Sequence, residues 1–211
     1  MSDLHHSQFG QDEFLDKYVF KGARDLFFVE IGSADPVNIN NTFYFETHKG
    51  WRGLLIEARP EACKNLVKHR SSEVINSCLS NQKGRSIFLD YGYLAGLCKF
   101  MSMKEHEYIE EYNSRDDHVR AYWVATEPLS GILECRKIQR INLLAIDVEG
   151  AEVSVLETID FSSVFIDVIL VECNMESAAK AVEKVLVENG FSRSRVLGAD
   201  HLYINAESCY R

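Results

Sequence analysis

The sequence predicts one α/β domain in which helices cover both faces of a mostly parallel, doubly wound sheet. Short, continuous apolar runs recur along the chain, as expected for strands that are buried on both faces. Segments with helical periodicity separate these runs, which is the pattern of β-α-β units. The 211 residues, 46% of them hydrophobic and 26% charged, fit a single globular domain spanning residues 1–211.

The apolar runs that predict strands differ in strength. Four are strong, namely Phe27–Val29, Leu54–Ile56, Leu143–Ile146 and Val168–Val171. Three are weaker, namely Val74–Ile75, Ile87–Leu89 and Leu202–Ile204.

Four segments between or before these runs predict helices. The first, Gln11–Phe20, would bury Phe14, Leu15, Tyr18 and Val19. The others are Thr42–Lys49, which ends at Gly50, the segment from Pro60 to His69, and Ala178–Leu186, which Gly190 follows as a stop signal.

The segment from Asp90 to Thr126 interrupts this alternation, because it is rich in aromatic residues and contains no buried-strand run. Long connections of this kind tend to be lids or binding loops. We therefore expect residues 91–126 to form a lid or acceptor-binding insert ahead of the fourth main strand. A plain helical insert is the alternative, since Met103–Tyr112 is compatible with a helix.

Charge and cysteine usage exclude several classes of protein. The chain has 23 Lys and Arg against 32 Asp and Glu, a net charge of −9, and no basic run, which disfavours a nucleic acid partner. No apolar stretch approaches the roughly 18 residues of a membrane span, and the first residues do not resemble a signal peptide. The six cysteines form no CxxC pair, so we expect reduced thiols and a cytoplasmic protein.

An acidic residue stands at or near the carboxyl end of each strong run: Glu30, Glu57, Asp147 and Glu172. A helix N-cap explains some such residues, but less readily all four. Ligands of open α/β sheets bind in the crevice beyond the carboxyl ends of the strands. Carboxylates there suit a ligand with hydroxyl or ammonium groups or a positive centre, and they suit a polyphosphate poorly.

The turn after the first strand refines this expectation. Gly32 permits a tight turn, but Ala34 stands where a dinucleotide fingerprint needs its second glycine. Glu57 follows Glu30 by 27 residues, where a carboxylate can accept the hydroxyls of a ribose. Together these features favour an adenosine-type ligand without a diphosphate, and S-adenosylmethionine fits.

Several segments resemble the FkbM family of S-adenosylmethionine-dependent methyltransferases. The most specific is Asp147-Val148-Glu149-Gly150-Ala151-Glu152. The others are Ser7–Asp12, Phe28–Gly32, Asn41-Thr42, Gly50–Gly53, Ile56–Pro60, Leu94–Leu97, Glu172–Asn174 and Asn189–Phe191. The resemblance implies a Rossmann-like methyltransferase fold with a seven-stranded sheet whose last strand is antiparallel. It also implies O-methylation of a hydroxyl on a sugar, a glycan or another small metabolite.

The resemblance also implies roles for individual residues. Glu30 and Gly32 would hold the methionine end of the cofactor, Glu57 would bind the ribose, and Cys78 and Leu79 would flank the adenine. Further cofactor contacts are expected at Ser33, Asp35, Asn41, Thr42, Ala58 and Asp147. Asp147 and Glu149 would lie beside the point of methyl transfer.

A hydroxyl acceptor must lose a proton, and a carboxylate or histidine can accept it. Asp147 is the first candidate for this base, although it could instead be a helix N-cap. Glu149 is the second candidate, although it could instead be a charge in the first turn of a helix, where the helix dipole favours it. His201 is the third candidate, although it could instead be an ordinary surface or core histidine. Oxygens of Asp147, Glu172 and Asn174 would also suit Mg²⁺, but we expect no metal.

Two features leave alternatives open. Pro36 stands where the family usually has glycine, and this departure favours a binding module of the same fold without turnover. A nicotinamide-dependent oxidoreductase is a third hypothesis, against which the missing glycines argue. Trp51 and the aromatic residues of the insert would shape the acceptor site, although core packing is the more common role of a single Trp.

Overall fold

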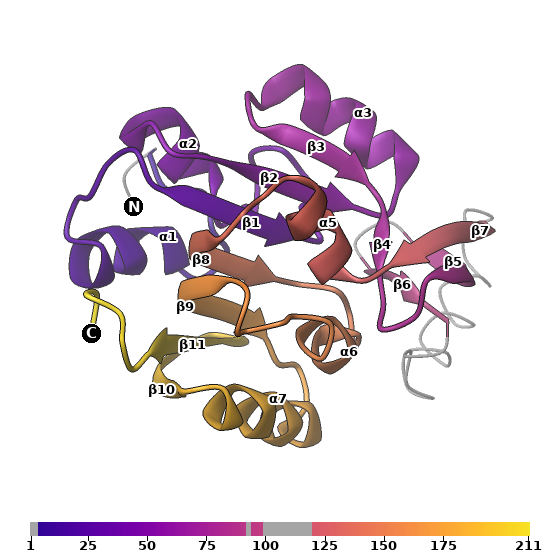
Figure 1. Ribbon diagram of the computed structural model, residues 1–211. Coiled ribbons are helices and arrows are strands. Elements are labelled where there is room, and N and C mark those ends of the chain that lie inside the picture. Colours follow the sequence, from indigo (N-terminus) through magenta and orange to yellow (C-terminus); the bar gives the residue numbers. More distant parts are fainter. Residues whose placement is uncertain (1–3, 92–93, 99–119) are drawn as a thin grey trace.

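A computed structural model describes residues 4–91, 94–98 and 120–211 (Figure 1). Its centre is a seven-stranded sheet with the order β10-β11-β9-β8-β1-β2-β3. These strands are β1 (Phe27–Ile31), β2 (Arg52–Glu57), β3 (Glu73–Asn76), β8 (Arg140–Ile146), β9 (Phe165–Glu172), β10 (Phe191–Leu197) and β11 (Asp200–Asn205).

The sheet is mixed. The strands from β3 to β9 pair in parallel, whereas β11, the last strand of the chain, is antiparallel to both of its neighbours. The sequence did not predict β10, because its residues 192–196 are exposed and provide no apolar run. The α/β class is thus confirmed, with antiparallel pairing at the β10–β11 edge.

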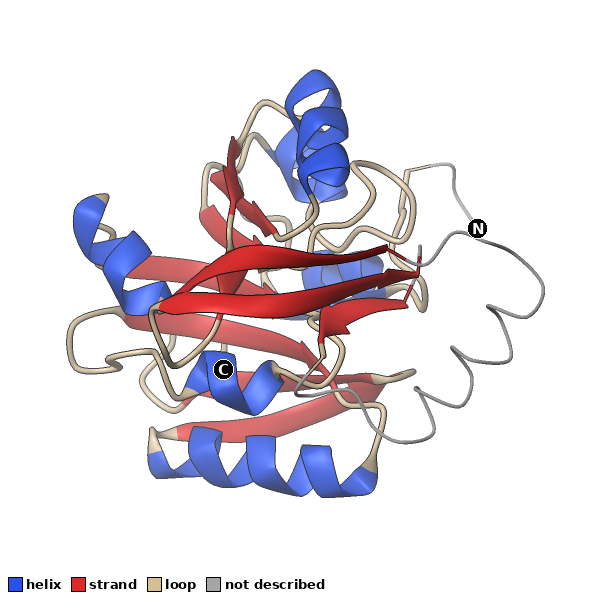
Figure 2. Ribbon diagram, turned by 90° about the vertical axis from the view of Figure 1, so that its right-hand side faces the viewer, coloured by secondary structure: helices blue, strands red, loops and turns tan. Residues whose placement is uncertain are grey.

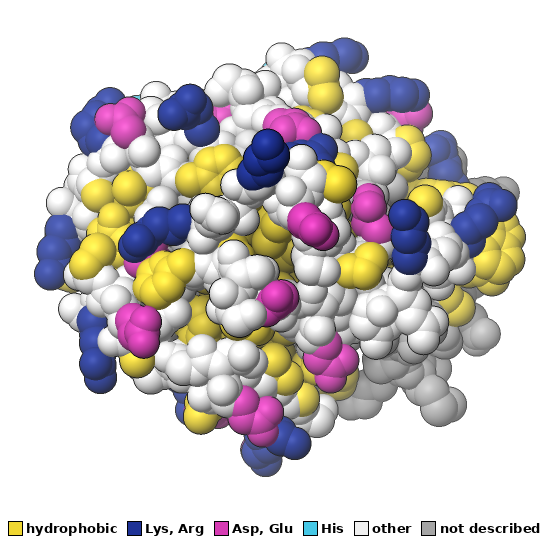
Figure 3. All heavy atoms as spheres, in the orientation of Figure 1, with side chains coloured by type: hydrophobic (Ala, Val, Ile, Leu, Met, Phe, Trp, Pro, Cys, Tyr) yellow, Lys and Arg dark blue, Asp and Glu magenta, His cyan; other side chains and the backbone are white. Residues whose placement is uncertain are grey.

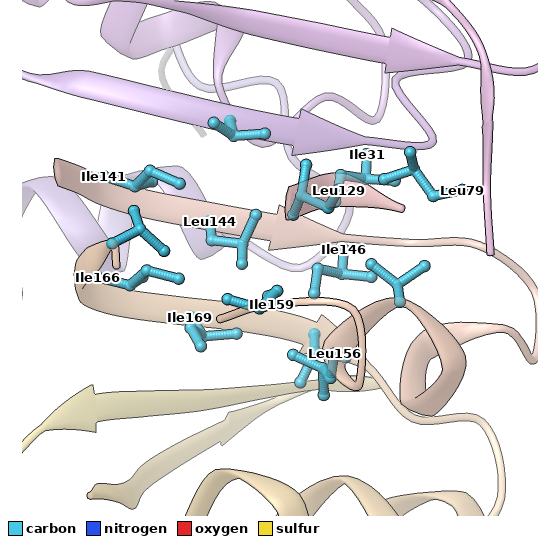
Figure 4. Packing of buried hydrophobic residues seen from close by; sticks show 14 of the residues in the cluster. Ile31, Leu79, Leu129, Ile141, Leu144, Ile146, Leu156, Ile159, Ile166 and Ile169 are labelled. Atoms are coloured by element: carbon cyan, nitrogen blue, oxygen red, sulfur yellow. The ribbon is translucent and has the colours of Figure 1, made fainter. Parts of the chain in front are cut away.

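Helices cover both faces of this sheet. They are α1 (Gln11–Phe14), the π-helix η1 (Leu15–Val19), α2 (Phe43–Lys49), α3 (Pro60–His69), α5 (Leu129–Cys135), α6 (Glu152–Leu156) and α7 (Glu176–Glu188). Side chains of η1, α2 and α3 pack on one face, around Phe28 and Leu143. Side chains of α5, α6 and α7 pack on the other, around Ile31, Leu144 and Ile169 (Figure 4). The doubly wound arrangement therefore follows from the alternation of buried side chains along each strand.

The N-terminal helix differs from its prediction in one respect. The backbone N–H of Phe20 donates to the oxygen of Leu15, five residues earlier, at 2.8 Å. In this wider π turn, Leu15 at its start and Val19 and Phe20 at its end are buried, whereas Tyr18 is 58% exposed. The expectation that Tyr18 is a core residue was wrong.

Trp51 belongs to the core. Its ring lies 4.4 Å from that of Phe45, and its Nε1 donates to the backbone oxygen of Ala23 at 3.0 Å. The core alternative therefore describes Trp51 better than a place in the acceptor site.

A second, four-stranded sheet stands at the carboxyl ends of the main parallel strands (Figures 1 and 2). Its order is β4-β7-β5-β6, and its strands are β4 (Cys78–Leu79), β5 (Gly84–Tyr91), β6 (Leu94–Leu97) and β7 (Arg120–Glu127). The run Ile87–Leu89 thus belongs to this sheet and not to the main one.

This second sheet corrects the expectation for residues 91–126. Within the described part of that range, β6 and β7 form strands rather than a loop or a helical insert. The residues Ala121–Ala125 of β7 are apolar, but of the strand only Val124 and Thr126 are buried, so this segment lacks the burial on both faces that marks the main strands. The helix-compatible segment 103–112 lies outside the described residues.

The surface shows acidic and basic side chains interspersed on the face seen in Figure 3. In the part of the chain that the structure describes, no helix has both the length and the apolar character that crossing a membrane requires. All six cysteines are free thiols, as expected.

Candidate functional site

A cavity of about 610 Å³, counting its open mouth, lies between the carboxyl ends of the main strands and the second sheet. The main sheet and its loops contribute Ile31, Gly32, Ala34, Ile56, Glu57, Ala58, Arg59, Asp147, Val148, Glu149 and Ala151. The segment after β3 and the second sheet contribute Ser77, Cys78, Leu79, Phe88, Ala95, Gly96 and Leu97. Of the predicted site residues, Gly32, Glu57, Ala58, Cys78, Leu79, Asp147 and Glu149 line this cavity.

The floor of the cavity is a close crossing of two backbone segments. Gly32 follows β1 with φ +82°, and a Cβ atom added there would lie 1.7 Å from the backbone oxygen of Asp147. The N–H of Asp147 donates to the oxygen of Ile31 at 3.0 Å, which holds the two strand ends together. Only glycine permits both this conformation and this approach.

Glu57 forms one side of the cavity and is almost fully buried. Its Oε2 accepts the N–H of Ala34 at 2.9 Å, and its Oε1 accepts the N–H of Arg59 at 2.8 Å and the guanidinium Nε at 3.2 Å. A carboxylate has about four acceptor sites, so Glu57 joins two loops and keeps acceptor capacity toward the cavity.

Glu30, by contrast, does not line the cavity. Its buried carboxylate accepts from the Asn40 side-chain amide at 3.0 Å, the Thr42 hydroxyl at 2.9 Å and the Asn41 N–H at 3.2 Å. Burial raises the pKa of Glu30, and the nearby Arg70 charge opposes that rise. Glu30 thus organises the loop after β1 instead of facing a ligand in this structure.

Arg70, at the end of α3, is the centre of the same network. Its guanidinium donates to Glu46 at 2.9 Å, to the Thr42 hydroxyl at 2.9 Å, to Asn40 Oδ1 at 3.1 Å and to the backbone oxygen of Pro36 at 3.3 Å. Its side chain is fully buried. The loop from residue 33 to residue 42 is therefore held by a charged side chain that the sequence analysis did not identify.

The departure at Pro36 has a structural explanation. The left-handed positions of this loop are Ala34, with φ +30°, and Ile39, with φ +52°. Position 36 requires no positive φ, and its carbonyl is one of the Arg70 acceptors. Proline is therefore compatible with this loop.

Other predicted cofactor contacts also shape this loop instead of lining the cavity. Ser33 donates from its hydroxyl to the oxygen of Glu30, and Asp35 accepts from the N–H groups of Val37 and Asn38. Asn41 and Thr42 are partners of Glu30, as described above.

His201 stands apart from the cavity. It lies on β11 and lines a different crevice with Cys173, Lys180, Glu183 and Arg193. Its Nδ1 is buried without a hydrogen-bond partner. The structure therefore separates His201 from Asp147 and Glu149, with which the sequence analysis grouped it.

Carboxyl groups crowd together at the β8 side of the cavity. Single oxygens of Asp147, Glu149 and Glu172 lie within 4.8 Å of one another, and Asp147 and Glu172 share a hydrogen bond. Burial raises the pKa of Asp147 well above its usual value, and the charges of Glu172 and Glu149 raise it further. Burial likewise raises the pKa of Glu172. The pair Asp147–Glu172 therefore binds a proton more readily than an isolated, solvated carboxylate does.

The same three oxygens have a spacing that a divalent cation can bridge. Asn174, which the sequence analysis placed in this set, instead donates its side-chain amide to Glu172 at 2.9 Å. A shared proton and a bound cation are two ways to relieve the same repulsion between carboxylates.

Sequence reasoning missed several residues of this site. Arg59 lies in the family-like segment Ile56–Pro60 but was assigned no role, and Arg70 gave no signal, because single basic residues beside a helix are common. Phe88 lies in the apolar run Ile87–Leu89, which predicts a strand but not that Phe88 reaches the cavity, and Leu97 lies in the short strand β6.

Breaking the Arg70 network should destabilise the fold. Arg70→Met leaves the buried carboxylates of Glu46 and Glu30 without their cation, and we expect a loss of about 3–5 kcal/mol in the free energy of urea unfolding. The control is Arg136→Met, which removes an exposed pair with Glu73 and should cost less than about 1 kcal/mol. Equal losses in both variants would show that Arg70 is not the centre of the loop.

The carboxyl pair should make stability depend on pH. Because the pKa of Asp147 is raised in the folded state, the folded protein binds more protons than the unfolded chain, and this contribution to stability falls as pH rises above about 4. Asp147→Asn should therefore unfold at higher urea than the wild type at pH 8, and the difference should shrink toward pH 4.

The matched control for this experiment is Asp160→Asn. Hydrogen bonds from Ser162 lower the pKa of Asp160, so this variant should gain no stability at pH 8. A constant difference between Asp147→Asn and the wild type from pH 4 to pH 8 would contradict the raised pKa of Asp147.

Comparison with solved structures finds similar folds at low sequence identity. A TehB-like SAM-dependent methyltransferase from Corynebacterium glutamicum is 10% identical over 94% of this chain and 89% of that chain, with a TM-score of 0.48. A methyltransferase from Pyrococcus furiosus is 12% identical over 91% and 78%, with a TM-score of 0.45. Fibrillarin from Aeropyrum pernix, solved with natively bound S-adenosyl-L-methionine, is 14% identical over 86% and 66%, with a TM-score of 0.45. Likeness at this level does not bear on the chemistry of the cavity.

No curated protein sequence matched the chain. The comparison with models of protein families, by contrast, found a match. The family model described as the methyltransferase FkbM domain matches residues 30–193, which is more than half of the chain and runs from the end of β1 into β10. The chain therefore belongs to the FkbM methyltransferase domain family.

Proposed function

We propose that this methyltransferase uses S-adenosylmethionine to methylate a hydroxyl of a sugar, a glycan or a small metabolite. The observation that carries the proposal is the polarity of the cavity. A single carboxylate, Glu57, stands on the β2 side, and the cluster of Asp147 and Glu149 stands on the β8 side.

The lining residues fit this cofactor. The remaining acceptor capacity of Glu57 suits a hydroxyl of a ribose. The negative charge at Asp147 and Glu149 favours a positively charged sulfur.

A dinucleotide fits less well. Among the lining residues that the structure describes, Arg59 is the one basic side chain, and it pairs with Glu57. The pyrophosphate of a dinucleotide usually sits on the N-terminus of a helix that directly follows the first strand. Here α2 begins at Phe43, well after β1 ends at Ile31. These features support a methyl donor over a nicotinamide cofactor.

When bound, S-adenosylmethionine supplies a methyl group that is already activated by the positive sulfur, so much of the catalysis can come from positioning. The protein must also accept the proton of the acceptor hydroxyl. Asp147 is the proposed base, because burial and the neighbouring carboxylates raise its pKa and so make it a stronger base than an ordinary aspartate. Glu172 then shares the proton through its hydrogen bond to Asp147, and Glu149 is the second candidate for the base.

The ribose role of Glu57 can be tested by calorimetry with S-adenosylhomocysteine. Glu57→Ala should lower the affinity roughly tenfold or more, since each hydrogen bond to a charged group contributes about 1.5–3 kcal/mol. Glu61→Ala, which changes an exposed residue of α3, should leave the affinity unchanged and serves as the control. If Glu57→Ala binds as tightly as the wild type, Glu57 does not hold the ribose.

The reaction itself can be tested by transfer of a labelled methyl group from S-adenosylmethionine to a panel of sugars, glycans and small hydroxylated metabolites. Asp147→Asn should lower the rate roughly 100-fold or more, because it removes a general base, with affinity for S-adenosylhomocysteine nearly unchanged. Asp160→Asn is the control and should react at the wild-type rate.

Two results would contradict this proposal. Tight binding of S-adenosylhomocysteine without transfer to any acceptor would favour a non-catalytic binding module. An unchanged rate in Asp147→Asn would assign the base to another residue.

A further inference from the structure

We propose that Gln11 is a positioning residue for Asp147, the proposed base, and that Asp200 transmits its effect. The inference rests on the proposed function, because it takes Asp147 as the group that accepts the proton of the acceptor hydroxyl. It gives a role to the segment Ser7–Asp12, which the mechanism above does not use. Neither Gln11 nor Asp200 lies within residues 30–193, which the family model matches.

Three carboxyl groups form a row across the carboxyl edge of the main sheet, on the adjacent strands β8, β9 and β11. Glu172, the last residue of β9, is the direct ladder partner of Asp200, the first residue of β11. Asp147 directly follows β8, whose last residue pairs with Val171, so it is the next neighbour of Glu172 in the β8–β9 ladder. The carboxyl groups of Asp147 and Glu172 share a hydrogen bond. Because directly paired residues project to the same face of a sheet, Glu172 stands between Asp147 and Asp200.

Gln11 ends this row at β11. Its side chain is buried, and its Nε2 donates to Oδ2 of Asp200, which is buried as well. Its Oε1 accepts the N–H of Phe9 at 2.7 Å, so the donor side of the amide faces the carboxylate. Burial raises the pKa of Asp200, and the hydrogen bond from Gln11 opposes that rise. Gln11 therefore stabilises the charged form of Asp200.

Contacts on both sides hold the N-terminal segment in this position. A Cβ atom added at Gly198, in the turn before β11, would lie 2.2 Å from the ring of Phe9, so the segment packs directly on that turn. The N–H of Asn40, in the loop after β1, donates to the backbone oxygen of His6 at 3.2 Å. Between these two points the sheet contains the ends of β8 and β9. The segment therefore spans the edge of the sheet at which the carboxyl row lies.

The charge of Asp200 strengthens the base. Neighbouring strands lie about 4.8 Å apart, so Asp200 is about one strand spacing from Glu172 and about two from Asp147. At these separations a buried negative charge favours the protonated forms of both carboxyl groups, and its effect on Glu172 is the larger. Because Glu172 is hydrogen-bonded to Asp147, the pair binds a proton more readily when Asp200 is charged. The proton of the acceptor then meets a stronger base.

Other polar groups also face the pair. Glu149, in the loop after β8, raises the pKa of Asp147, and Glu152, at the start of α6, raises that of Glu172. The Asn174 side-chain amide donates to Glu172 at 2.9 Å. All of these groups remain when the glutamine is replaced, so a shift in such a variant reports on the β11 side of the row.

The experiment follows the carboxyl groups by carboxyl ¹³C NMR titration in the presence of EDTA, which removes a bound cation as a cause of any shift. Gln11→Met removes the amide and keeps a side chain of similar size. Gln8→Met makes the same change at an exposed position of the same segment and is the matched control. Asp200→Asn removes the charge itself and identifies the Asp200 signal. Asp147→Asn identifies the Asp147 signal, and thermal unfolding of each variant shows whether it remains folded.

We expect the Asp200 titration to move to higher pH in Gln11→Met, because the charged form of Asp200 loses a hydrogen bond. The Asp147 titration should move to lower pH by about half a pH unit or more in Asp200→Asn and in Gln11→Met, because a negative charge near the pair is lost or weakened. Gln8→Met should titrate like the wild type. The double variant Gln11→Met/Asp200→Asn should match Asp200→Asn alone, because Gln11 acts through Asp200.

The same change should appear in the pH dependence of methyl transfer. The acid limb of the rate should move to lower pH in Gln11→Met, because a weaker base is already ionised at lower pH. The maximal rate should fall, because that base accepts a proton less readily. A merely structural loss would lower the rate at every pH and leave the acid limb in place.

An unmoved Asp200 titration in Gln11→Met would overturn the inference, and so would an unmoved Asp147 titration in either Gln11→Met or Asp200→Asn. A further shift in the double variant, beyond that of Asp200→Asn, would also overturn it, because Gln11 would then act by another route. These titrations do not depend on turnover, so they leave the proposed function intact. If the wild type transfers no methyl group to any acceptor, the proposed function fails whatever the titrations show, and Gln11 has no base to position.

Discussion

The close approach of β1 and β8 is the constraint on which the site depends. The chain passes from β1 through α2 to β2 on one side, whereas β8 lies on the other side of β1, and the strand order reverses there. Ligands of open α/β sheets bind at such a reversal. Gly32 lets the two strand ends meet, because any side chain at this position would collide with the backbone of Asp147. The cavity and the carboxylates that line it are arranged around this point.

The four carboxylates at strand ends have different roles because their surroundings differ. Glu57 accepts hydrogen bonds from backbone N–H groups and from Arg59 and faces the cavity, and Asp147 is hydrogen-bonded to Glu172. Glu30 is enclosed by the loop after β1 and by Arg70. Position at the end of a strand therefore brings a carboxylate to the right edge of the sheet, but local hydrogen bonds decide whether it faces a ligand.

The sequence predicts the main strands well where burial on both faces produces continuous apolar runs, as in β8 and β9. It fails for β10, whose exposed residues at the sheet edge carry no such signal, and for β6 and β7, which are buried on one face. It also fails for Arg70, because a buried arginine and an exposed one look alike without their partners. Gly32, Glu57 and Asp147 were found because strand ends and their spacing are visible in the sequence, whereas Phe88 reaches the cavity through pairing between distant strands.

The most direct test of this account is a crystal structure of the protein with S-adenosylhomocysteine. We expect the ligand in the cavity between β1, β8 and the second sheet, with its ribose hydroxyls at hydrogen-bond distance, about 2.5–3.0 Å, from the Glu57 carboxylate. Its sulfur should lie on the Asp147 side of Gly32. Binding in another crevice, such as the one beside His201, or a ribose turned away from Glu57, would contradict the account.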